Sequence, residues 1–115
     1  MPKYALGFDF GTESVRVLVV DIRNGQIAGQ ASSNYEHGVI DDALPSGGGR
    51  LPVDYALQHP QDWLDSLAKA CRAAMVQAKV AADAVIGIGV DFTSCTMLPA
   101  LADGTPLCLD EKFSR

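Results

Sequence analysis

Apolar and polar residues alternate at the start of the chain, which predicts a strand over residues 4–10. The apolar members fall on every second position, at Tyr4, Leu6, Phe8 and Phe10. In an extended chain such positions share one face, so this face is expected to be buried while Asp9 emerges on the other. The unbroken apolar run VLVV at residues 17–20 predicts a second strand, over residues 15–21, that is buried on both faces.

An Asn-Gly pair at residues 24–25 predicts a tight turn into a third strand over residues 26–34, so three antiparallel strands open the fold. Residues 35–59 then lose all periodicity and contain three consecutive glycines and two prolines. They are expected to form a long irregular insertion. His37 and His59 belong to this insertion, have no partner at metal-ligand spacing, and are interpreted as ordinary polar residues.

A helical period follows Pro60, a residue suited to the first turn of a helix. Apolar residues recur every three or four positions, at Leu64, Leu67, Ala68, Cys71, Met75 and Ala78. They predict one apolar stripe that packs on the sheet. Cys71 lies within the stripe and is interpreted as core rather than as a nucleophile. Asp62 is expected to favour the positive end of the helix dipole.

A second apolar run, AVIGIGV at residues 84–90, is rich in β-branched residues and predicts a buried parallel strand. It leads into a polar turn at residues 91–96. Ligands of open α/β sheets gather at the carboxyl ends of parallel strands, so this turn is a candidate site. An Asp-Gly pair at residues 103–104 predicts a terminal hairpin between residues 97–101 and 106–109.

The turn after the first strand carries residues that suit a phosphate. Asp9 is followed by Gly11, which lets the backbone turn and approach a ligand closely. The amides of Gly11, Thr12, Glu13 and Ser14 are expected to face an anion, with Asp9 holding a hydrated Mg²⁺ that bridges phosphate oxygens. A polar hairpin tip without a ligand is the alternative for so short a motif. Neither a P-loop nor a dinucleotide-binding glycine pattern occurs.

Composition narrows the function classes. The net charge is -5 and the nine basic residues are scattered, which argues against a nucleic-acid surface. No apolar run approaches the roughly 18 residues of a membrane helix, and the N-terminus lacks a secretory cleavage site. The three cysteines show no metal-like spacing. We therefore expect one domain in a reducing cytoplasm, with no membrane and no nucleic acid as partner.

Several segments together resemble the N-terminal part of the FGGY family of sugar kinases. They are GFDFGTESVR at 7–16, YEHGVID at 35–41, YALQHPQDW at 55–63 and GIGVDFTSCTMLP at 87–99. The resemblance covers essentially all of residues 1–115 and implies the α/β, ribonuclease H-like fold of actin-like ATPases, here incomplete. At residues 92–95 the sequence FTSC is similar to the ribulokinase branch, whereas glycerol kinase-like members carry an Asn-Gln-Arg-Glu type sequence.

The resemblance implies a kinase that transfers the γ-phosphate of ATP to a pentulose, with L-ribulose favoured and a xylulokinase-like activity as the alternative. ATP phosphates are expected at Asp9, Gly11, Thr12, Glu13, Ser14 and Arg16, and Mg²⁺ at Asp9 through water. A structural salt bridge is the alternative for Arg16. The sugar is expected at Asp91, Thr93, Ser94, Cys95 and Thr96. The family's catalytic base is expected beyond Arg115, and the C-terminal lobe is missing, so this fragment alone is expected to be inactive.

Two other functions stay open. A ribonuclease H-like nuclease would use Asp9 and Asp91 as ligands of two metal ions, although a basic groove and a clear helix carboxylate are missing. The other is a non-catalytic fragment whose exposed sheet edge pairs with another chain, or with itself as a homo-oligomer.

Overall fold

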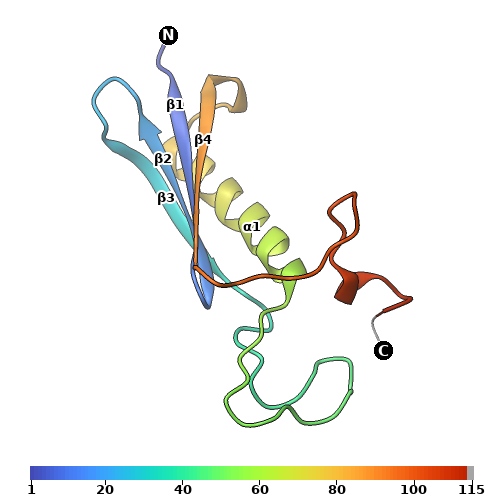
Figure 1. Cartoon of the computed structure of the whole chain (residues 1–115). Coiled ribbons are helices and arrows are strands. Elements are labelled where there is room, and N and C mark those ends of the chain that lie inside the picture. Colours follow the sequence, from blue (N-terminus) through green and yellow to red (C-terminus); the bar gives the residue numbers. More distant parts are fainter. Residues whose placement is uncertain (114–115) are drawn as a thin grey trace.

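The computed structural model describes residues 1–113 and shows a four-stranded sheet covered on one face by a helix (Figure 1). The elements are β1 (Tyr4–Phe10), β2 (Ser14–Asp21), β3 (Ile27–Asn34), α1 (Pro60–Ala78), η1 (Ala82–Ala84), β4 (Val85–Phe92) and η2 (Leu107–Leu109). The strand order is β3-β2-β1-β4. The β1–β2 and β2–β3 pairs are antiparallel and the β1–β4 pair is parallel. The predicted succession of three antiparallel strands, helix and parallel strand is confirmed.

The core lies between the sheet and α1, and its centre is β2. The side chains of Val15, Val17 and Val19 are fully buried and pack in one cluster with Leu6 of β1 and the facing residues of α1. Leu18 points to the other face and is only half-buried. The predicted burial of this strand on both faces is therefore confirmed for one face only.

Helix α1 faces the sheet with small residues; of the predicted apolar stripe, Leu67, Cys71, Met75 and Ala78 pack against the core as expected, while Leu64 does not. The buried residues of α1 are Pro60, Asp62, Ser66, Ala70 and Ala74. Leu64 is 62% exposed, while Leu67 and Cys71 flank the contact. The cause is the close approach of β3, since a Cβ on Gly29 would lie 2.7 Å from the carbonyl oxygen of Ala74. Only small side chains fit between backbones at this separation.

Strand β4 pairs in parallel with β1 as predicted, but its predicted burial is wrong. Ile88, Val90 and Phe92 are 59%, 57% and 69% exposed. β4 is an edge strand with β1 as its only neighbour in the sheet, and the main contacts of α1 are with β2 and β3. Among the described residues, no element covers the outer strand, so an apolar sequence lies exposed.

The insertion at residues 35–59 is ordered by isolated antiparallel bridges, between Ile40 and Leu57 and between Ala43 and Arg50. Together with the C-terminal segment, it extends away from the sheet (Figure 1). The radius of gyration is accordingly 16.8 Å, compared with about 13 Å for a compact domain of about 100 residues. No helix within residues 1–113 has the length and apolar character to cross a membrane.

The terminal hairpin is reduced to a turn with a single bridge. Ala100 pairs with Pro106, and the amide of Leu101 donates to the carbonyl of Thr105 at 2.8 Å. No strand forms on either side within the described residues. Pro99 and Pro106 lack the amide protons that a ladder needs, which accounts for the difference from the prediction.

Candidate functional site

The turn after β1 and the turn after β4 lie at the same end of the sheet. Phe10 is the register partner of Phe92, and the amide of Thr93 donates to the carbonyl of Phe10 at 3.2 Å. Because the two strands are parallel, their carboxyl ends reach the same edge. The predicted phosphate turn and the predicted sugar turn are therefore neighbours, although they come from distant parts of the chain.

A groove with a volume of about 540 Å³ runs between the two turns. Its lining includes Thr12 from the first turn and Thr93, Ser94, Cys95 and Thr96 from the second. Gln58 and Trp63 line it from the insertion and from α1. An adjoining apolar pocket of about 260 Å³ contains Gly11 and shares Gln58, Trp63, Thr93 and Thr96. Sites for small ligands have volumes of roughly 300–1,000 Å³, so the groove has a suitable size.

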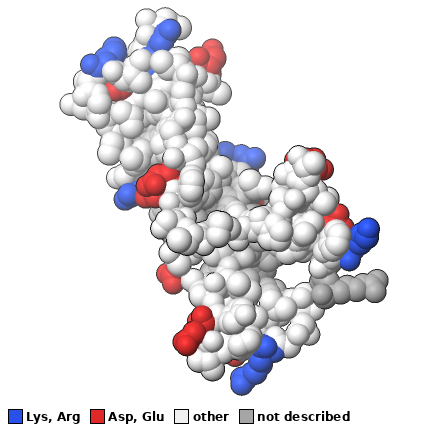
Figure 2. Space-filling view, in the orientation of Figure 1, with Lys and Arg blue, Asp and Glu red and all other residues white. Residues whose placement is uncertain are grey.

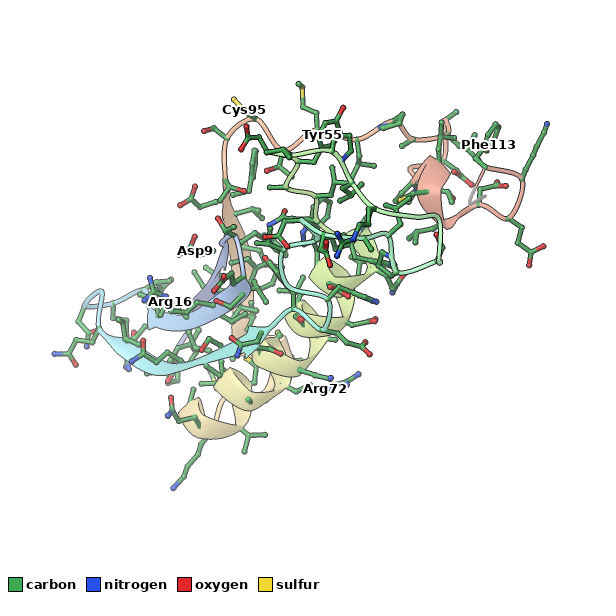
Figure 3. All side chains as sticks on the ribbon, turned by 90° about the horizontal axis from the view of Figure 1, so that it is seen from below. Asp9, Arg16, Tyr55, Arg72, Cys95 and Phe113 are labelled. Atoms are coloured by element: carbon green, nitrogen blue, oxygen red, sulfur yellow. The ribbon has the colours of Figure 1, made fainter. Side chains whose placement is uncertain are left out.

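The turn after β4 folds sharply at Cys95, which has a φ of +65°. This conformation is uncommon for a residue other than glycine and is found at turns and functional sites. The hydroxyl oxygens of Thr93 and Thr96 lie 3.1 Å apart, within hydrogen-bond distance. Figure 3 shows Cys95 at this bend, at the same end of the molecule as Tyr55 of the insertion.

Asp9 and Asp91 lie on the sheet face opposite α1. They are register partners on β1 and β4, and Asp9 alternates with Phe8 and Phe10, which pack against the core. Asp9 forms an ion pair with Arg16 at 3.4 Å, and the side chains are 48% and 58% exposed (Figure 3). Asp9, Arg16 and Asp91 are thus next to one another, but none of them lines the groove.

The two ends of the insertion hold the tip of the first hairpin through three consecutive carbonyl groups. The hydroxyl of Tyr35 donates to the carbonyl of Gly11 at 3.0 Å, and its amide donates to that of Glu13 at 2.9 Å. The side-chain amide of Gln58 donates to the carbonyl of Thr12 at 2.7 Å. Sequence reasoning missed both donors, because they lie 24 and 46 residues from the carbonyls that they reach.

These contacts fix the direction of the tip amides. In a trans peptide the carbonyl and the following N–H point in opposite directions, and no cis peptide occurs among the described residues. The amides of Thr12, Glu13 and Ser14 therefore point away from the insertion. The amide of Gly11 instead donates to the carbonyl of Ser14 at 2.8 Å. This hydrogen bond closes the turn and occupies the Gly11 amide, so a contact of Gly11 with a phosphate through that amide stays a prediction.

The hydroxyl of Tyr35 is suited to its role as a donor. Tyr35 is 5% exposed, and burial, followed by the negative charges of Asp9 and Asp62, raises the pKa of this hydroxyl above its ordinary value of 10.0. A phenol with a raised pKa stays protonated at neutral pH. Its hydrogen bond to Gly11 is therefore kept over the physiological range.

His37, His59 and Asp62 form a cluster with their ligand atoms within 4.8 Å of one another, so the interpretation of the two histidines as ordinary polar residues without a partner at metal-ligand spacing is wrong. The buried carboxylate of Asp62 accepts the amide of His37 at 2.9 Å and lies 2.8 Å from its Nδ1. The two imidazole rings are stacked, with centroids 4.3 Å apart and planes inclined by 11°. Nearly parallel rings do not aim their in-plane lone pairs at one ion. We interpret the cluster as a structural contact that holds the insertion against α1.

Comparisons with known proteins agree with this geometry. The family model for the FGGY family of carbohydrate kinases, N-terminal domain, matches residues 4–107. A ribulokinase of Shouchella clausii is 46% identical over 99% of this chain, and one of Halalkalibacterium halodurans is 50% identical over 93%. A ribulokinase of Mycolicibacterium smegmatis is 48% identical over 98% of the chain. The chain spans only 20%, 19% and 20% of the length of these relatives.

A solved structure with the same fold is that of a xyloylose kinase from Brucella ovis. It matches with a TM-score of 0.69 over 90% of this chain and 19% of that chain, at 23% sequence identity. The predicted fold, a part of the ribonuclease H-like, actin-like ATPase fold, is confirmed by this likeness.

Proposed function

Because the chain belongs to the FGGY family of carbohydrate kinases, we propose that it forms the N-terminal part of an ATP-dependent pentulose kinase acting on L-ribulose. The choice of sugar is supported by identities of 46%, 50% and 48% to three proteins named ribulokinase. The structural observation that carries the proposal is the groove lined by Thr12 and by residues 93–96. A carbohydrate can lie in this groove, and the hairpin tip that would hold the phosphates borders it at Thr12.

The phosphate end of the proposed site is the hairpin tip. The outward amides of Thr12, Glu13 and Ser14 suit phosphate oxygens, and Gly11 closes the turn that presents them. When bound, Mg²⁺-ATP supplies the phosphoryl group and neutralises its charge. The residues present fit the metal, because the half-exposed carboxylate of Asp9 has only a long 3.4 Å contact to Arg16 and can accept hydrogen bonds from the waters of a hydrated ion.

The sugar end of the proposed site is the turn at residues 93–96. The hydroxyls of Thr93, Ser94 and Thr96 can donate to and accept from the hydroxyls of a sugar. Small residues at Ser94 and Cys95 leave room for a five-carbon chain, which an Arg-Glu pair would reduce. Asp91 lies beside Asp9 on the other face. We therefore assign Asp91 to the phosphate and metal side rather than to direct sugar contact.

The alternative functions have less support. The adjacency of Asp9 and Asp91 would also suit a two-metal nuclease, but Figure 2 shows Lys and Arg scattered over the face drawn, without a basic stripe for a nucleic acid. A xylulokinase-like activity is supported by a neighbour of only 23% identity.

The proposed location is a reducing cytoplasm. It is supported by the proposed use of ATP as a substrate and by the free cysteines Cys71, Cys95 and Cys108.

Pairing of the chain with itself stays a prediction that concerns the exposed edge of β4. Light scattering tests it, since a homo-oligomer would have at least twice the mass of the chain, while a stable monomer would contradict pairing.

The proposed function is tested by exchange into a relative. This chain would replace the corresponding N-terminal segment of the Halalkalibacterium halodurans ribulokinase, and ADP release would be measured with L-ribulose, D-xylulose and glycerol. We expect turnover that depends on L-ribulose and is weaker with the other two. The purified 115-residue chain alone is the control and should show none. A folded chimera that releases no ADP with either pentulose would contradict the proposal.

A further inference from the structure

Gln58 connects the hairpin tip with the wall of the groove. Its Nε2 donates to the carbonyl of Thr12 at 2.7 Å, and its Oε1 accepts from the indole N–H of Trp63 at 3.2 Å. The donor and the acceptor of the side-chain amide are thus both hydrogen-bonded, which fixes its orientation. Gln58 and Trp63 line the groove as well as the adjoining apolar pocket. One side chain therefore contacts the predicted phosphate turn and a residue of the predicted sugar groove.

We propose that Tyr35 and Gln58 are positioning residues for anion binding at the hairpin tip, and that Gln58 couples the tip to Trp63. The inference rests on the proposed function for the identity of the anion, the phosphates of a nucleotide. It goes beyond that function because the two residues belong to the irregular insertion and act through backbone carbonyls, without touching the anion themselves.

The physical basis is the orientation of the peptide planes at residues 11–14. Thr12 and Glu13 are exposed and lie in a bend outside the β-ladder, so few other contacts restrain them. Holding each carbonyl toward the insertion turns the next amide outward. Loss of one such hydrogen bond lets its peptide plane rotate, and the anion must then reorder it on binding. Preorganisation of this kind strengthens binding by removing the ordering cost.

Trp63 provides a built-in reporter of the coupling, because it is the single tryptophan of the chain. Its indole N–H gives one distinct signal in a ¹⁵N-correlated NMR spectrum, and the partner of that N–H is Gln58. A change at the hairpin tip that moves the Gln58 amide should therefore move this signal. Simple loss of stability would not produce a ligand-dependent shift in a folded protein.

The test is a titration of the ¹⁵N-labelled chain with inorganic pyrophosphate. In the wild type we expect saturable shifts of the amides of Thr12, Glu13 and Ser14, accompanied by a shift of the Trp63 indole. Gln58→Met has a similar size but neither hydrogen bond. It should bind pyrophosphate about tenfold more weakly, since a hydrogen bond contributes about 0.5–1.5 kcal/mol and 1.4 kcal/mol is about tenfold. The indole response should be lost.

Two further variants separate positioning from general damage. Gln61→Met makes the same substitution on an exposed turn of α1, where Gln61 bonds Asp65, and should bind within about twofold of the wild type. Tyr35→Phe removes only the hydroxyl that reaches Gly11 and should weaken binding about threefold, the lower end of the range for one hydrogen bond. It also serves as the deciding variant if Gln58→Met does not fold.

The proposal is overturned if pyrophosphate does not shift the tip amides of the wild type. It is equally overturned if a folded Gln58→Met, or Tyr35→Phe in its place, binds as tightly as the wild type. Its failure is distinguishable from that of the proposed function. A chimera without kinase activity beside an intact Gln58 effect would reject the kinase alone, while an active chimera beside an unaffected Gln58→Met would reject the positioning role alone.

Discussion

β2 and β4 have similarly apolar sequences, SVRVLVVD and VIGIGVDF, and opposite surroundings. On β2 the side chains of Val15, Val17 and Val19 are 0% exposed, whereas on β4 those of Ile88, Val90 and Phe92 are more than half exposed. β2 has a strand on each side and α1 above it; β4 has only β1. Apolar composition shows that a strand favours burial, and the topology decides whether the chain itself provides the cover.

The largest difference in stability is expected between substitutions at Gly29, on β3 beside β2, and at Gly89, on β4. At Gly29, next to β2, a Cβ would lie 2.7 Å from backbone atoms of Ala74 and Ala78, whereas at Gly89 of β4 it would meet nothing within 4 Å. Gly29→Ala should therefore lower the free energy of unfolding by about 3 kcal/mol, the upper end for overpacking. Gly89→Ala should be neutral or raise it by about 0.5 kcal/mol. Urea denaturation measures both, and equal effects would contradict the comparison.

A smaller difference in the free energy of unfolding is expected when a valine is changed to alanine on each of the two strands. Val17→Ala removes two methyl groups from a side chain that is 0% exposed and leaves a cavity, which should cost about 2 kcal/mol. Val90→Ala removes them from one that is 57% exposed and should cost less than about 0.5 kcal/mol. The midpoints of urea unfolding give the difference. Comparable losses would mean that β4 is covered in solution.

The smallest effect concerns Asp21, at the end of β2. Hydrogen bonds from the side chain and amide of Arg23 lower the pKa of Asp21 from 3.8 to about 2. The folded state thus favours the charged carboxylate, and the resulting stability is present above the unfolded pKa and lost as the pH falls through the folded pKa. Asp21→Asn should flatten the melting temperature between about pH 4 and pH 2. The exposed Asp83→Asn is the control; an unchanged pH profile in Asp21→Asn would refute the prediction.

The sequence predicted those features that arise from local pattern. The alternation along β1 placed the partly buried Phe8 and Phe10 against the core and Asp9 on the far face, and Pro60 begins α1 as expected. The strand-end rule brought Thr12 and the turn at residues 93–96 to one groove. These outcomes depend on residue spacing of two, or on one pairing between parallel strands, and both are visible in a sequence.

The features that the sequence did not predict depend on distances between backbones and on contacts between residues far apart in the sequence. Ser66, Ala70 and Ala74 face the sheet because β3 approaches α1 at Gly29, which helical periodicity does not show. Gln58 reaches a carbonyl 46 residues away by crossing from the insertion to the hairpin. The sequence offered one signal for this contact: Gln58 is a polar residue two positions before the start of α1 at Pro60, in a segment that otherwise has no regular pattern.

The central claim is that the two strand-end turns border one groove that holds the sugar, with Thr12 and Gln58 on one wall and residues 93–96 on the other, and titration of the ¹⁵N-labelled chain with L-ribulose tests it most directly. We predict that the amide of Thr12, the side-chain amide of Gln58 and the amides of residues 93–96 shift together. Residues 24–25 and 82–84, at the other end of the sheet, should not shift. Shifts at that other end, or in only one of the two turns, would contradict the account.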